Sequence, residues 1–163
     1  MKPALLIIDL QKAYYGTRTS VFMDGAVFGI NRLQPAFRTR NLPIAWIQHI
    51  DEADLSKPGL PGFDFIDGLE PKEGDLRISK AYNDSFAKTG LAEMLRERDV
   101  DTVFVSGFCA EYCITATYFG ARSNDFYPIL VKRGLAGASQ EKIDLVESSY
   151  ESASIGAITR LLD

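Results

Sequence analysis

The chain has few of the residues that several common kinds of site and scaffold require. Its 163 residues include one histidine and two cysteines, Cys109 and Cys113. Two cysteines are too few for a disulfide framework, and one histidine leaves too few soft ligands for an ordinary zinc site. We therefore expect a protein of a reducing compartment, the cytoplasm, that works with no metal and no other cofactor.

Long apolar runs and an excess of positive charge are also lacking. The first apolar run, ALLII, is interrupted by Asp9 and Gln11, so it is too short for a signal-peptide core or a membrane span. Lysine and arginine number 18 against 22 aspartates and glutamates, a net charge of −4 with no basic stripe. These features predict neither a nucleic-acid nor a membrane partner.

The composition that remains is that of an ordinary globular protein. Hydrophobic residues make up 46% of the chain and charged residues 25%. A length of 163 residues is close to that of one domain, and no repeat or linker divides it. We expect residues 1–163 to form a single domain.

Strand-like and helix-like segments alternate along the chain. We expect strands at 4–9, 43–49, 76–79, 102–107 and 127–131 and a short one near 153–158. The expected helices are 25–39 with Asp24 as N-cap, 87–98, 111–121 and one near 140–150, and the long loops are 11–23 and 51–74. This alternation predicts an α/β fold, a doubly wound, Rossmann-like parallel sheet of about six strands in the order 3-2-1-4-5-6, with helices on both faces.

Three chemically complementary residues meet at one edge of this sheet. Ligands of such sheets bind at the carboxyl ends of the strands, where the winding reverses, which is between the first and fourth strands. Asp9 ends the first strand, and Cys113 lies in the first turn of the helix after the fourth. Lys80 ends the third strand and must reach across the second. Asp9 can serve as base for the thiol, while Lys80 and the helix N-terminus favour a thiolate.

Three segments resemble the isochorismatase-like cysteine hydrolases in content, order and spacing: ALLIIDLQ, ISKAYNDSF and VFVSGFCAEYCITATYFGA. The resemblance runs from about residue 4 to 131. The family includes nicotinamidases, N-carbamoyl amidohydrolases and isochorismatases. It implies a catalytic triad of Asp9, Lys80 and Cys113, and an oxyanion hole made by the main-chain N–H groups of Cys109 and Cys113. It also implies a cis peptide bond between Phe108 and Cys109, and a homodimer or homotetramer.

Other residues near these segments are candidates for the walls of a substrate pocket. For His49 a hydrogen-bonded structural role, a substrate contact and metal ligation all stay open. Nicotinamidases carry a D-x-H…H metal cluster after the second strand, whereas this chain reads QHIDEAD with a single histidine, so that cluster cannot be built in its usual form. The acidic segment 51–75 reads as a solvated rim. The candidate pocket residues are Gln11, Tyr15, His49, Tyr82, Phe86, Phe108 and Tyr118, with Tyr14 among the flanking aromatics.

These observations predict a hydrolase of a small amide, carbamoyl or related compound that acts through a thioester on Cys113. The alternative reaction is isochorismatase-type cleavage of a vinyl ether, which needs an acid to protonate carbon and has no need of a thiol. A third interpretation is a catalytically idle, oligomeric member of the family.

Overall fold

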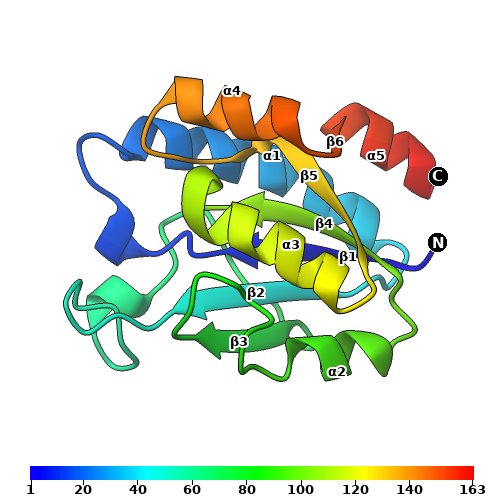
Figure 1. The fold of residues 1–163 in the computed structure, drawn as a ribbon, viewed down its shortest axis with the longest axis horizontal. Coiled ribbons are helices and arrows are strands. Elements are labelled where there is room, and N and C mark those ends of the chain that lie inside the picture. The colour runs from blue at the N-terminus through cyan, green and yellow to red at the C-terminus, as the bar shows by residue number, and fades with distance from the viewer.

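The computed structural model describes residues 1–163 and is built around one six-stranded parallel sheet. Its strand order is β3-β2-β1-β4-β5-β6, which confirms the predicted α/β architecture (Figure 1). The strands are β1 (Pro3–Ile8), β2 (Ile44–His49), β3 (Leu76–Lys80), β4 (Thr102–Gly107), β5 (Tyr127–Leu135) and β6 (Ser152–Ser154).

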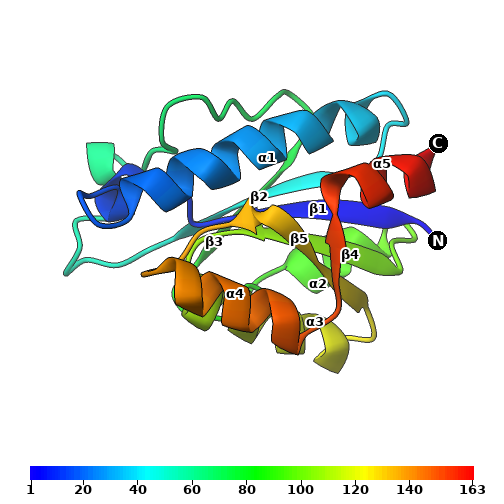
Figure 2. The same ribbon diagram turned by 90° about the horizontal axis from the view of Figure 1, so that it is seen from above.

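Helices cover both faces of the sheet (Figure 2). The helices α1 (Ser20–Arg38) and α5 (Ile155–Leu162) lie on one face, and α2 (Leu91–Arg96), α3 (Thr115–Ser123) and α4 (Gln140–Ser149) lie on the other. Short 3-10 helices, η1 (Lys12–Tyr14) and η2 (Pro61–Phe63), lie in the connections after β1 and β2, and a π-helix, η3 (Ala110–Ile114), precedes α3. No helix combines the length and the apolar character needed to cross a bilayer.

The central strands are apolar throughout because each of their faces packs against a layer of helices. All six residues of β1 are buried. Leu5 and Ile7 belong to the core beneath α1, whereas Leu6 and Ile8 belong to the core beneath α2, α3 and α4. The middle of the sheet is therefore rigid, and its strand ends are fixed points from which polar side chains can be held.

Helix α1 starts five residues earlier than the sequence pattern predicted. Its N-cap is Thr19, so Asp24, the expected cap, lies inside the helix. The residues before Asp24 include Gly16 and a cluster of threonine and serine, a composition typical of loops, so the first residues of the helix were not predicted. Gly29 is needed for packing, because a Cβ atom there would lie 2.1 Å from the carbonyl oxygen of Arg133 in β5.

Other boundaries differ for equally local reasons. The last strand was expected near 153–158, but β6 ends at Ser154, whose hydroxyl accepts a hydrogen bond from the Ala157 N–H and so begins α5. Helix α2 begins at Leu91 and not at 87, because Lys88 has a left-handed backbone (φ 55°) and Gly90 is the N-cap. Strand β5 continues four residues past its expected end.

Candidate active site

Asp9 is placed by the close approach of β1 and β4 at the switch point of the sheet. It directly follows β1 with φ 53°, and its N–H donates to the Ile47 carbonyl at 2.9 Å. On its other side β1 lies equally close to β4, because the N–H of Phe108, which follows β4, donates to the Ile8 carbonyl at 2.8 Å. A Cβ atom on Gly107 would lie 2.1 Å from that same Ile8 oxygen, so only glycine fits there. The Asp9 carboxylate is 1% exposed.

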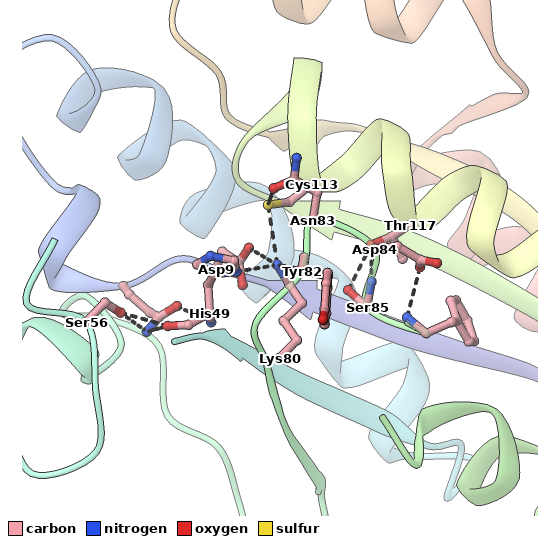
Figure 3. A network of polar contacts seen from close by, with 12 residues as sticks. Asp9, His49, Ser56, Lys80, Tyr82, Asn83, Asp84, Ser85, Cys113 and Thr117 are labelled. Atoms are coloured by element: carbon pink, nitrogen blue, oxygen red, sulfur yellow. Dashed lines mark hydrogen bonds and ion pairs between the residues drawn. The ribbon is translucent and has the colours of Figure 1, made fainter. Parts of the chain in front are cut away.

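Lys80 crosses β2 and reaches both of the other triad candidates (Figure 3). It pairs in register with His49 at the end of β2, and its side chain is fully buried. Its Nζ lies 2.7 Å from Oδ2 of Asp9, 3.3 Å from Sγ of Cys113, 3.1 Å from the Tyr82 carbonyl oxygen and 3.1 Å from Nδ1 of His49. The structure thus brings Asp9, Lys80 and Cys113 together.

Cys113 lies in the π-helix η3, where an ordinary α-helical first turn had been expected. The N–H groups of Tyr112 and Ile114 both donate to the Cys109 carbonyl, at 3.0 and 3.2 Å. Such widened turns are frequent at functional sites because they re-aim one side chain. Beyond Lys80, the sulfur contacts Oδ1 of Asn83 at 3.6 Å.

The loop that carries Asn83 is fastened to the helix that follows Cys113. Ser85 bonds Oγ1 of Thr117 through its N–H at 3.0 Å and its hydroxyl at 2.8 Å. Asp84 packs so closely on α3 that a Cβ atom at Gly120 would lie 2.0 Å from its Oδ1. These contacts hold the 80–85 segment and the Cys113 helix as one unit.

The surroundings of Cys113 do not favour the resting thiolate that the sequence led us to expect. Burial raises the pKa of Asp9, although the neighbouring ammonium of Lys80 opposes the rise. Burial and the negative charge of Asp9 raise the pKa of Cys113 to about 12, again against the effect of Lys80. Burial thus favours a neutral thiol, and it makes Asp9, when ionised, a stronger base than an exposed aspartate.

Cys109 contributes a free main-chain amide beside the thiol. The Phe108–Cys109 peptide bond is cis, as the resemblance implied. The Cys109 N–H makes no hydrogen bond within the protein, whereas its Sγ donates to Oε2 of Glu111 at 2.9 Å. Burial and Glu111 together raise the pKa of this thiol above its ordinary value. This side chain is therefore held as a neutral hydrogen-bond donor.

Among the pocket candidates, His49 and the main chain of Tyr82 contact Lys80. Gln11 bonds the His49 backbone, and Phe108 bonds the Ile8 carbonyl next to Asp9. Gln11 is fully buried and holds loop backbone in place. The two N–H groups at its Nε2 are shared among the His49 carbonyl, Ser56 Oγ and the Phe63 carbonyl, at 3.2, 2.9 and 3.1 Å, and its Oε1 accepts from His49 N–H at 2.7 Å. The Tyr82 hydroxyl accepts a hydrogen bond from Lys88 at 3.0 Å, and the Lys88 ammonium lies over its ring.

Three of the expected pocket residues have their polar or ring contacts with other parts of the protein. Tyr15 is 44% exposed and donates to both carboxylate oxygens of Asp24 in α1. Phe86 stacks in the core on Phe126, just before β5. Tyr118 lies further along α3, where its hydroxyl accepts from the Glu151 N–H before β6. Helix α3 runs back from η3 toward the amino ends of the strands, and Tyr118 lies on it five residues beyond Cys113.

Tyr14 is the aromatic residue that sequence reasoning left out of the pocket in favour of its neighbour. Its ring stacks on Phe108 with centroids 5.8 Å apart, and its hydroxyl is buried without a hydrogen-bond partner. Burial raises the pKa of Tyr14 to about 12, although the nearby Ser56 hydroxyl opposes the rise. The 3-10 helix η1 rotates residue 14 inward, a turn that residue spacing in a loop does not reveal.

Comparison with known proteins decides the family. The isochorismatase domain model matches residues 3–155. This chain belongs to the isochorismatase family. The isochorismatase family protein YrdC of Bacillus subtilis is 27% identical over 164 residues, 97% of this chain and 85% of the relative. Maleamate amidohydrolase of Pseudomonas putida is 26% identical over 150 residues, 80% of this chain and 70% of that enzyme.

The fold comparison agrees with the family. The crystal structure of an isochorismatase-like hydrolase from Alkaliphilus metalliredigens has a TM-score of 0.91 and 22% identity, and it covers 100% of both chains. Homologues in the isochorismatase family are hydrolases and include amidohydrolases. The chain is accordingly an isochorismatase-family hydrolase.

Metal ligation was one of the three roles that the sequence left possible for His49. Asp9, His49 and Cys113 each offer one ligand atom, and these atoms lie within 4.8 Å of one another. The Lys80 ammonium, however, lies in contact with all three residues, at 2.7, 3.1 and 3.3 Å. A divalent ion among these ligands would sit against a buried positive charge. These residues do not fit a metal ion while Lys80 keeps its place.

Proposed function

We propose that the protein hydrolyses a small amide, carbamoyl or related compound through a thioester on Cys113. The observation that carries the proposal is the position of Lys80 Nζ, which contacts Asp9 at 2.7 Å and Cys113 at 3.3 Å in a buried site. Nucleophilic catalysis by cysteine requires a base and a group that stabilises charge, both placed close to the sulfur.

In the first half of the proposed reaction Asp9 takes the proton of the Cys113 thiol as the sulfur attacks the carbonyl carbon. Because burial and Asp9 raise the pKa of the thiol, proton transfer and attack are coupled, and no free thiolate accumulates. The carbonyl oxygen becomes an oxyanion and accepts a hydrogen bond from the unpaired Cys109 N–H. The N–H of Cys113 is the second expected donor.

In the second half Asp9 gives the proton to the leaving nitrogen, the carbon–nitrogen bond breaks, and a thioester remains. Asp9, again a carboxylate, then takes a proton from a water molecule that attacks the thioester, and it returns that proton to the sulfur as the acid product leaves. Lys80 holds Asp9 in place and offsets its buried charge at each stage.

The relatives support amide chemistry without naming this substrate. Maleamate amidohydrolase, 26% identical, is named for an amide substrate. A second candidate reaction, vinyl-ether cleavage, is favoured by one observation, the raised pKa of Asp9, because that reaction needs a protonated acid. It leaves the contact between Cys113 and Lys80 without a catalytic purpose.

A substrate screen tests both reactions. Purified protein is incubated with small amides, carbamoyl compounds and isochorismate, with ammonia and pyruvate release as readouts, in parallel with Cys113→Ala. We expect ammonia from an amide or carbamoyl compound and none from the variant. Pyruvate release that persists in Cys113→Ala, with no ammonia from any compound, would establish the second reaction in place of the first.

A further inference from the structure

His49 is held beside the triad by its main chain. Its N–H donates to Gln11 Oε1 at 2.7 Å, and its carbonyl accepts from Ser56 Oγ at 2.8 Å and Gln11 Nε2 at 3.2 Å. A ring nitrogen lies within 4.8 Å of ligand atoms of both Asp9 and Cys113. The ring therefore has a fixed position next to the sulfur.

The contact with Lys80 determines which ring nitrogen carries the proton. Nζ of Lys80 lies 3.1 Å from Nδ1 of His49. The same Nζ contacts the Asp9 carboxylate and the Tyr82 carbonyl, which can only accept, so Lys80 is the donor in this cluster. Nδ1 then accepts with its lone pair, and a neutral ring carries its hydrogen on Nε2. Burial and the charge of Lys80 lower the pKa of His49, which agrees with a neutral ring at pH 7.

The Nε2–H of His49 has no acceptor in the protein. Nε2 makes no hydrogen bond, yet it is not among the enclosed polar atoms without partners, so it reaches solvent. Two other donors in this part of the protein are also unpaired, namely the Cys109 N–H and the buried Tyr14 hydroxyl, whose pKa is raised by burial and also by the charge of Asp9. The protein thus holds several unpaired donors, the His49 Nε2–H among them, that a ligand could satisfy.

We propose that His49 is a specificity residue whose Nε2–H donates to a second oxygen of the substrate. One substrate oxygen, that of the reacting carbonyl, goes to the Cys109 amide, and a further carbonyl or carboxylate oxygen goes to His49. The site then takes small amides or carbamoyl compounds that carry another oxygen acceptor near the reacting carbon. This inference rests on the proposed function, because it assumes that the reacting carbon binds at Cys113.

The single histidine allows a test that does not depend on turnover. In the Cys113→Ala variant labelled with 15N-histidine, long-range 1H–15N spectra report both ring nitrogens. At pH 7 we expect a neutral ring protonated on Nε2. Malonamide, which has two carbonyl oxygens, should shift the Nε2 resonance and slow exchange of its proton. Butyramide, of similar size with one carbonyl, should do neither. A charged ring, an Nδ1–H tautomer, or an equal or undetectable response to the two compounds would overturn the proposal.

Kinetics of two His49 variants separate recognition from structure. For a neutral hydrogen bond the expected effect is about tenfold. In His49→Phe, KM for malonamide should rise by about that factor, and the preference for malonamide over butyramide should be lost. His49→Gln keeps an N–H donor and should recover part of the preference for malonamide. Equal losses for both substrates would mean a merely structural role and contradict the inference. Hydrolysis that persists in Cys113→Ala would overturn the proposed chemistry but leave the spectroscopic result standing.

Discussion

Nζ of Lys80 lies 2.7 Å from Oδ2 of Asp9, with none of the lysine side chain and only 2% of the aspartate side chain exposed to solvent. A buried pair of this kind is costly to desolvate and is strongly destabilising to break, since one charge is then left alone. A direct role of the Lys80–Asp9 pair in the reaction at Cys113 would explain why the protein contains so costly an interaction. Each partner should therefore affect reactivity and stability in a predictable direction.

Cys113→Ala should abolish amide hydrolysis with little effect on the fold, because only one small, partly exposed side chain is removed. Ammonia release and the thermal unfolding midpoint check this. The matched variant, Cys109→Ala, should lose far less activity, since Cys109 is expected to act through its main-chain N–H. If Cys113→Ala kept more than about a tenth of wild-type turnover, the thioester route would have to be abandoned.

Asp9→Asn should separate thiol reactivity from catalysis. Loss of the base is expected to lower turnover by about 10²–10⁴. The same change removes a negative charge that raises the pKa of Cys113, so that pKa should fall and alkylation by iodoacetamide should reach its half-maximal rate at a lower pH. Mass spectrometry of the Cys113 adduct measures this. An alkylation profile shifted to higher pH would show that Asp9 does not act on the sulfur as described.

Lys80→Met should have the opposite effect on the thiol. Lys80 lowers the pKa of Cys113, so its removal should raise that pKa and slow alkylation at a given pH. Lys12→Met, which changes an exposed lysine, is the matched control and should alkylate as the wild type does. Unchanged alkylation in Lys80→Met would remove Lys80 from its proposed role.

The same Lys80→Met variant should show a pH-dependent loss of stability. Without the ammonium, the main group that opposes burial is lost, so the folded-state pKa of Asp9 rises further above the unfolded value. The loss of unfolding free energy relative to the wild type should then be smallest at acid pH, where Asp9 is protonated in both states, and should grow as the pH rises through the folded-state pKa. At neutral pH the expected loss is about 3–5 kcal/mol. Denaturant titrations between acid and neutral pH measure it, and a pH-independent loss would contradict this account.

Activity should survive EDTA and dialysis, because the Lys80 ammonium lies in contact with the three residues that could ligate an ion. Metal analysis is expected to find no stoichiometric zinc or iron. Loss of turnover on chelation, with recovery on adding one divalent ion, would instead require Lys80 to move aside.

We expect the chain to form a homodimer or homotetramer in solution, an expectation that rests on the family resemblance. Light scattering over a range of protein concentrations measures the mass. A monomer mass at every concentration would contradict it.

The meeting of Asp9, Lys80 and Cys113 could be predicted from sequence because strand ends in a parallel sheet share one edge. Asp9, Lys80 and Cys113 follow or end three strands whose apolar runs are unmistakable, and register with His49 lets the long Lys80 side chain cross β2. The state of the thiol could not be predicted, because it depends on the balance of burial, Asp9 and Lys80 at distances that only coordinates supply.

The pocket walls were harder to predict than the triad. Tyr15 and Tyr118 were chosen as pocket candidates only because they lie close in sequence to Asp9 and Cys113. A single 3-10 turn decides that Tyr14 and not Tyr15 faces Phe108, and the direction of α3 carries Tyr118 toward Glu151. Such rotations are set by tertiary packing, which no local pattern encodes.

The carboxamide of Gln11 fastens the segment that follows β2 to the end of β1. One buried side chain joins the end of β1 to Ser56, Phe63 and the His49 backbone, while the sheet beneath is held by its own cores. Gln11→Ala should therefore open residues 50–65 to protease nicking well below the global unfolding temperature. If residues 50–65 were exchanged with those of a relative, we expect the new segment to adopt its own conformation only where it offers Gln11 acceptors equivalent to Ser56 and Phe63.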